Sequence, residues 1–182
     1  MTTEETLREI KLELRANMNG VVSGQMRQAG ANYHVNFGVE LPRLQIIAQE
    51  FAPNHEVAQQ LWHENVRESK ILAGILMPTE RFSPELCDLW LEQIPNAEIA
   101  QMTVMNLFAR LPYATEKAFE WIASDREMWQ LCGFLLMARL IIQGTILNDR
   151  SREELLDQAH SLQNVQNLHL RKAVQNVLIR IE

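Results

Sequence analysis

Four tryptophans, Trp62, Trp90, Trp121 and Trp129, are the side chains of this sequence best suited to contact a nucleobase. Proteins that bind single strands, or that take a base out of a duplex, stack the base on such aromatic rings. Each of the four, however, lies in a segment whose apolar residues recur at helical spacing. That spacing favours packing in a core. We therefore predict core or boundary positions for the tryptophans, with base stacking as the alternative.

The sequence gives little support for a metal site or for a catalytic nucleophile. The five histidines are scattered, and no two have the i,i+4 spacing that places two zinc ligands on one face of a helix. The motifs G-x-x-x-x-G-K-[ST], G-x-G-x-x-G and G-x-S-x-G are absent. The adjacent acids Glu153 and Glu154 suit the first turn of a helix, where the helix dipole favours negative charge. We therefore expect no metal ion and no cofactor.

The charge balance of the chain is acidic. Its 182 residues carry a formal net charge of −6, and 47% of them are hydrophobic. This composition is typical of a globular protein with a sizeable core, whereas tight non-specific DNA binding usually goes with a basic balance. The one basic doublet close to a predicted inner helix face is Arg171–Lys172. We predict a solvated face for it, with a phosphate contact as the alternative.

Cysteine usage and hydropathy indicate a cytoplasmic protein. Two cysteines in a chain of this length are not a disulfide framework. Residues 1–13 are charged and have no apolar signal-peptide core. The longest apolar stretch, Phe134–Ile142, is interrupted by Arg139 and is far shorter than the ~20 residues that span a bilayer. We therefore expect no membrane partner.

Helix signals dominate the chain. Thr2 and Glu5 form a capping box before the first predicted helix. Ser83-Pro84-Glu85 supplies a capping residue, a proline at the first helical position and an acid in the first turn. The sequence as a whole predicts about ten helices joined by loops of about 2–6 residues, and no strand with clean period-two alternation.

Three further helices are expected in the second half of the chain. One covers residues 97–111. The next is a long apolar helix over residues 126–143, capped by Asp125. The third opens on a capping box at Ser151-Arg152-Glu153-Glu154.

Short helices on short loops place sequence neighbours antiparallel. The resulting pairs must stack, because no single pair buries its apolar face alone. The sequence therefore predicts an all-α fold, a right-handed α-α superhelix of stacked antiparallel helix pairs of the HEAT or armadillo kind. We expect a single domain over residues 1–182, with a compact helical bundle as the alternative.

Four segments in chain order stand out, namely Phe37–Leu44, Leu61–Trp62 with Arg67–Glu68, Trp121–Asp125, and Lys172–Val174 with Val177–Leu178. Together they resemble motifs of the bacterial DNA alkylation repair family. Members of this family are HEAT-like-repeat DNA glycosylases that excise positively charged alkylpurines. The resemblance covers residues 25–182 and implies a HEAT-like fold with DNA as the partner of its concave groove.

The resemblance also implies where catalytic residues should lie. Family members carry a tryptophan and, four residues later, an aspartate on a central helix, then an arginine on the next long helix and a second tryptophan near the C-terminus. These positions fall here on Ala97, Gln101, Leu131 and Asn176. The family aspartate stabilises the positive charge that develops on the sugar, and a neutral glutamine does not replace that charge. The resemblance thus implies a retained architecture without catalytic residues.

Three functional hypotheses follow. The first is a non-catalytic HEAT-like protein that binds a nucleic acid or a protein partner on its concave face. Its candidate binding residues are Glu98, Gln101, Trp129, Asn176, Arg171 and Lys172. The second is an active alkylpurine DNA glycosylase in which Glu98 is a relocated carboxylate and Trp129 a displaced aromatic residue. The third is an unrelated helical protein, such as a dimeric interaction module. The sequence leaves the choice between monomer and dimer open.

Overall fold

The computed structural model of the chain describes residues 1–182 and contains only helices and connecting segments. It has eleven α-helices, two short 3-10 turns and no strand. A single isolated bridge links Val35 to Val66. The chain divides into two compact units, residues 1–82 and residues 83–182. No helix is both long and apolar enough to cross a membrane.

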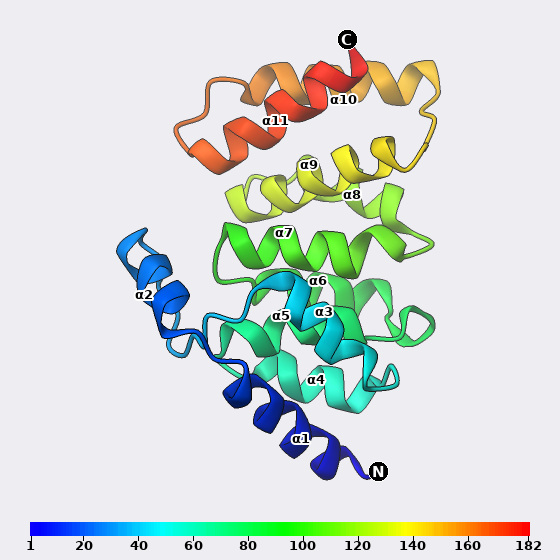
Figure 1. Ribbon diagram of the computed structural model, residues 1–182. Coiled ribbons are helices and arrows are strands. Elements are labelled where there is room, and N and C mark those ends of the chain that lie inside the picture. The colour runs from blue at the N-terminus through cyan, green and yellow to red at the C-terminus, as the bar shows by residue number, and fades with distance from the viewer. The chain divides into compact units, whose positions relative to one another are not determined.

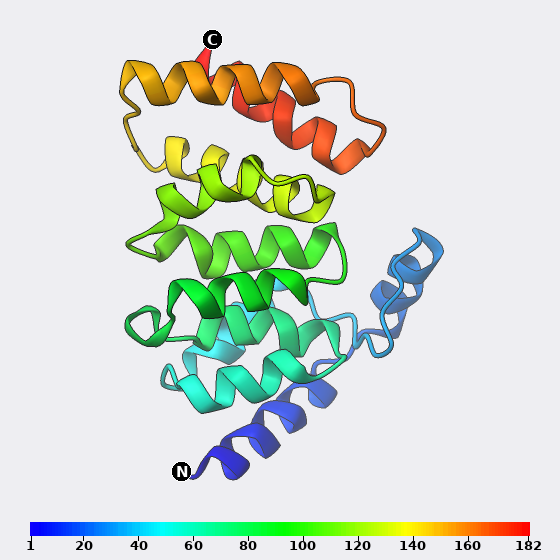
Figure 2. The ribbon, with the colours of Figure 1, turned by 180° about the vertical axis from the view of Figure 1, so that it is seen from behind.

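The first unit contains five α-helices and the 3-10 turn Thr79–Arg81. The helices are α1 (Thr3–Ala16), α2 (Gly20–Gln28), α3 (Leu41–Gln49), α4 (His55–His63) and α5 (Arg67–Leu76). Helix α5 packs against both α3 and α4, and α1 packs against α4. Helix α2 stands apart from the other helices of this unit in both views (Figures 1 and 2).

Side-chain caps begin two helices of the first unit, and one of them is the capping box that the sequence predicts. The Glu5 amide donates to Thr2 Oγ1 at 3.2 Å, and the Thr2 amide donates to Glu5 Oε2 at 2.7 Å. This confirms the capping box before α1. Asn54 caps α4 by accepting a hydrogen bond from the Val57 amide at 3.0 Å. These side chains satisfy amides that have no partner within the helix.

A buried ion pair holds the loop before α3 against the start of α5. Arg67 and Glu68 are adjacent and almost fully buried, and their Nη1 and Oε1 atoms lie 2.9 Å apart. Glu68 also accepts hydrogen bonds from the amides of Phe37 and Val39, and Arg67 donates to the Val39 carbonyl at 2.9 Å. The first two of the family-like segments are therefore joined by direct contacts.

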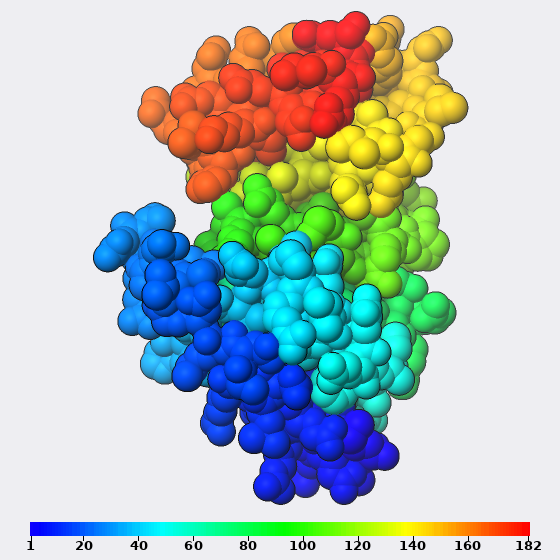
Figure 3. All heavy atoms as spheres, viewed as in Figure 1, coloured from blue at the N-terminus to red at the C-terminus, as the bar shows by residue number.

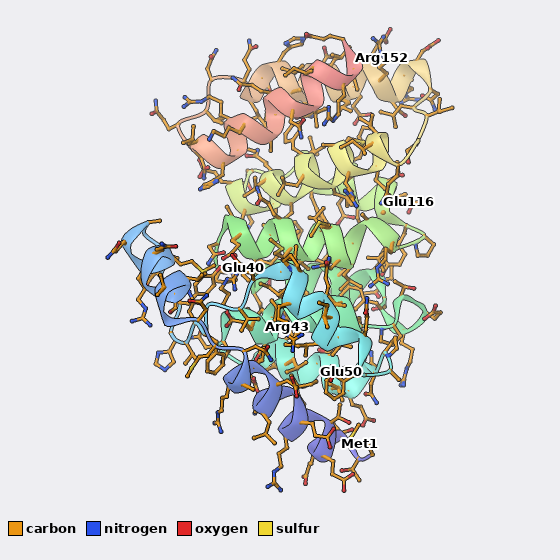
Figure 4. The ribbon with its side chains drawn as sticks, in the orientation of Figure 1. Met1, Glu40, Arg43, Glu50, Glu116 and Arg152 are labelled. Carbon is orange, nitrogen blue, oxygen red and sulfur yellow. The ribbon has the colours of Figure 1, made fainter.

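The second unit contains six α-helices and the 3-10 turn Phe108–Arg110. The helices are α6 (Pro84–Glu92), α7 (Ala97–Asn106), α8 (Ala114–Ile122), α9 (Glu127–Ile142), α10 (Asp149–Leu162) and α11 (Leu168–Ile181). Helix α9 packs against α6, α7, α8 and α11, and α10 packs against α11 (Figures 1 and 2). Arg152, labelled in Figure 4, joins α10 to the end of α11 by donating to the Ile181 carbonyl at 3.0 Å.

Two helix starts in the second unit differ from the prediction. Helix α10 begins one turn earlier than expected, because Asn148 caps it by accepting from the Ser151 amide at 2.8 Å. The capping box predicted at Ser151 is therefore wrong. The capping position of α9 is Arg126, and Asp125 does not cap this helix. Ser124 instead accepts from the Arg126 amide at 3.2 Å. The start signal at Ser83 is confirmed.

Helix α7 is shorter than predicted. It ends at Asn106, and the backbone leaves helical geometry at Leu107, before the 3-10 turn. Phe108 then packs on the ring of Trp121, with the ring centroids 5.1 Å apart. Burial of the consecutive side chains after Asn106 takes precedence over continuation of the helix to Leu111.

Candidate functional site

Three of the four tryptophans belong to the core. Trp62, Trp90 and Trp121 are at most 1% exposed, so the prediction of core packing is confirmed for them. The Trp121 Nε1 donates to Asp88 Oδ1 at 2.9 Å, and Lys117 Nζ lies 2.7 Å from Asp88 Oδ2. The Trp121–Asp125 segment therefore contributes a structural contact between α8 and α6, and its tryptophan is not available to stack on a base.

A small open hollow in the second unit brings together two of the residues singled out in the sequence. It has a volume of about 160 Å³. Its lining comes from α7, α9 and α11 and consists of Gln101, Val104, Met105, Leu135, Ala138, Arg139, Ile142 and Asn176. Figure 3 shows the molecular surface set back between α7 and α11. The hollow combines an apolar wall with two amide side chains and one guanidinium group.

Helical periodicity places these side chains on facing surfaces. The α9 residues of the lining, from Leu135 to Ile142, follow the spacing i, i+3, i+4, i+7, which defines one face of a helix. The α7 residues, from Gln101 to Met105, follow i, i+3, i+4. Because α9 packs against both α7 and α11, Gln101 and Asn176 approach Arg139 from the two neighbouring helices.

Arg139 is the one charged residue of the hollow. Its Nε is buried and has no hydrogen-bond partner, and the guanidinium makes no ion pair. No aspartate, glutamate or aromatic residue belongs to the lining. The sequence does carry a signal for this residue, because Arg139 is the one charge within the apolar stretch Phe134–Ile142. A charged side chain is uncommon in an apolar helix, because burying a charge without a partner is energetically unfavourable.

The other positions that the resemblance indicates do not belong to the lining of the hollow. Leu131 is 4% exposed and packs in the core. Ala97 and Glu98 lie in the first turn of α7, and neither belongs to the lining. Glu98 precedes Gln101 by three residues, so its Cα lies about one turn away along the same helix.

Trp129, Arg171 and Lys172 also lie outside the lining. Trp129 is half-buried near the start of α9, and the Arg126 guanidinium lies 5.0 Å from its ring centre. The Trp129 Nε1 is buried and has no partner. Lys172 is exposed, four residues before Asn176 on α11, and Arg171 is half-buried. These three residues therefore remain predicted binding candidates that lie outside the hollow.

A larger hollow of about 460 Å³ lies in the first unit, but all its lining residues come from α1. Its basic residues are Arg8, Lys11 and Arg15, and Lys11 forms an ion pair with Glu64 at 2.6 Å. A face built by one helix does not bring groups from different elements together. The chain also brings together no group of three histidine, cysteine, aspartate or glutamate side chains that would hold a metal ion.

Comparison with known proteins gives one family match and one close structural match. Residues 10–181 match the family described as "DNA alkylation repair enzyme". None of the curated proteins matches the sequence. A solved structure, described as "a new family of proteins related to the HEAT-like repeat DNA glycosylases with affinity for branched DNA structures", superposes with a TM-score of 0.86 at 18% sequence identity. The match covers 96% of this chain and 75% of that one. The predicted all-α, HEAT-like fold class is confirmed.

Proposed function

This chain belongs to the DNA alkylation repair enzyme family, and on that premise we propose that it binds DNA without excising bases, through the face formed by α7, α9 and α11. The observation that carries the proposal is the lining of the hollow. Gln101, Arg139 and Asn176 all line it, and no carboxylate is among the lining residues.

The chemistry of base excision argues against catalysis at this hollow. When a cationic alkylpurine leaves, positive charge develops on the sugar, and a nearby carboxylate stabilises that charge. The Gln101 amide is neutral, so it supplies no such stabilisation. The Arg139 guanidinium is positive and lies in a partly apolar environment, where like charges repel more strongly than in water. The hollow therefore disfavours a developing cation.

The same groups favour contact with a nucleic acid. Guanidinium and amide donors are the usual partners of DNA phosphates. The structurally similar protein has affinity for branched DNA structures. We therefore propose that a DNA junction is bound more tightly than linear duplex by this chain as well.

Binding and base release test the proposal in parallel. A labelled four-way junction, a linear duplex and a single strand of matched composition are titrated with the protein at several salt concentrations. Alkylated DNA is incubated with the protein, and free 7-methylguanine is measured. We expect junction binding that weakens as salt rises, and no base release above the rate without protein. If no DNA form binds at low salt, the proposal is wrong and a protein partner becomes the better hypothesis.

Glu98 gives the alternative its one supporting observation, because it is a carboxylate about one turn from Gln101 on α7. An active glycosylase that uses Glu98 would release 7-methylguanine, and the substitution Glu98→Gln would abolish that release. The matched control Glu116→Gln changes an acid on α8, which contributes no residue to the hollow. Release by wild type and by Glu116→Gln, but not by Glu98→Gln, would establish the alternative.

A further inference from the structure

We infer that Arg139, together with the side-chain amides of Gln101 and Asn176, forms a binding site for one phosphate group of a DNA strand. The inference rests on the proposed function and deepens it, because it names the chemical group that enters the hollow. It starts from the three polar residues that α9, α7 and α11 bring to the hollow.

The Arg139 guanidinium is able to bind a ligand of opposite charge. Buried donors in folded proteins almost always have a partner, yet the buried Nε of Arg139 has none, and the side chain makes no ion pair. The residues around it in the lining are mainly aliphatic. In such surroundings the attraction between the guanidinium and an anion is stronger than in water.

The lining discriminates between classes of ligand. A cation would be repelled by Arg139, and no lining acid offsets that repulsion. A nucleobase would find no aromatic face on which to stack. A purely apolar ligand would leave the Arg139 donors without a partner. An oxyanion satisfies all three polar groups, because each amide contributes an N–H donor and the guanidinium presents a planar fork of donors to two oxygens.

Inorganic phosphate and a DNA phosphodiester share this chemistry, so the experiment tests both. The substitution Arg139→Gln removes the charge and keeps a polar side chain, and Arg139→Lys keeps the charge without the planar fork. Arg150→Gln is the matched control, because Arg150 is an exposed arginine on α10, outside the hollow. Thermal unfolding shows that each variant is folded before binding is measured.

We expect Arg139→Gln to weaken junction binding by about tenfold at low salt, the scale of one hydrogen-bonded charge contact. The slope of log affinity against log salt should fall by about 0.9, which corresponds to one phosphate contact. Arg139→Lys should bind with intermediate affinity. Arg150→Gln should change neither the affinity nor the slope by more than a small fraction of these amounts. Equal losses in Arg139→Gln and Arg150→Gln would show general charge attraction and overturn the inference.

A second measurement observes the site directly. In protein labelled with ¹⁵N-arginine, the Nε–H signal that disappears in Arg139→Lys belongs to Arg139, and it is followed while inorganic phosphate or junction DNA is added. A shift of this signal with both ligands supports the inference. DNA binding that is unchanged in Arg139→Gln, with no shift of the signal, overturns the inference and leaves the proposed function standing. A shift with phosphate in a protein that binds no DNA refutes the proposed function, and it also overturns the assignment of a DNA phosphate to this site.

Discussion

Two arginines, one in each unit, differ in whether their charge has a partner. Arg67 is 3% exposed and has Glu68 Oε1 and the Val39 carbonyl within hydrogen-bond distance. Arg139 is half-buried, and its Nε has no partner at all. The Arg67 charge holds the loop before α3 against α5. The Arg139 charge has no such partner, so it is available to bind a ligand.

The same division separates the segments that resemble the family from the hollow. Phe37, Val39 and Glu68 are joined by hydrogen bonds, and Trp121 donates to Asp88. These residues are contacts of the framework. Gln101 and Asn176, two of the positions that the resemblance indicates, lie in the hollow, and no carboxylate or aromatic residue is among its lining. The family-like segments thus mark how the chain folds, whereas Gln101, Arg139 and Asn176 of the hollow lie outside them.

The largest predicted effect is on stability, and it comes from the buried pair of Arg67 and Glu68. Glu68→Gln removes a buried carboxylate that accepts from two backbone amides and pairs with Arg67. Breaking a buried pair by removing one partner costs about 3–5 kcal/mol. We expect the free energy of unfolding, measured by urea denaturation, to fall by about that amount, while the DNA affinity of the folded fraction stays unchanged.

Glu9→Gln is the matched control for this substitution, because Glu9 is an exposed acid on α1. It should change the free energy of unfolding by less than about 0.5 kcal/mol, as is usual for surface positions. If Glu68→Gln lowered the free energy of unfolding no more than Glu9→Gln does, the buried pair would not hold the loop before α3. Arg67 would then not be a structural charge, and the contrast with Arg139 would fail.

An intermediate effect on the free energy of unfolding is predicted for the substitution of Lys117. Its ammonium lies 2.7 Å from Asp88 Oδ2 and 2.9 Å from Glu120 Oε2. Burial disfavours the charged form, but the hydrogen bonds to Asp88 and Glu120 outweigh it and raise the pKa of Lys117 above its ordinary value of 10.5. Lys117→Met should lower the free energy of unfolding near neutral pH by about 1–2 kcal/mol, the scale of a lost charged hydrogen bond.

The sign of the pH dependence follows from the raised pKa of Lys117. A group that binds its proton more tightly in the folded state stabilises the protein fully below its unfolded pKa, and that contribution is lost as the pH rises through the folded pKa. The difference in unfolding free energy between wild type and Lys117→Met should therefore shrink as the pH rises above 10.5. A difference that stays constant across this range would mean that packing, and not charge, accounts for the effect.

Much of the framework follows from local sequence signals. The capping residues Thr2, Asn54 and Ser83 each act on the helix that follows them. The prediction failed where two signals compete within one turn. Asn148 and Ser151 are both good capping residues, and the helix begins at the earlier one. The end of α7 is set by the packing of Phe108 against Trp121. Local helix propensity does not predict this contact, because the two residues lie on different elements.

The hollow was only half predictable. The family resemblance pointed to Gln101 and Asn176, and both belong to the lining. Arg139 was visible as a charge in an apolar stretch, but its lack of a partner depends on which residues α7 and α11 place beside it. That is a property of packing between helices far apart in sequence, so no local pattern encodes it.

The smallest predicted effect on stability is the most direct test of the comparison. In Arg139→Met an aliphatic side chain replaces a charge whose Nε has no partner. Because no ion pair is broken and the surrounding lining is mainly apolar, the free energy of unfolding should change by less than about 0.5 kcal/mol or rise slightly. Junction affinity should fall nonetheless. A loss of stability approaching that of Glu68→Gln would mean that Arg139, like Arg67, serves the framework, and the distinction between a used and an available charge would no longer hold.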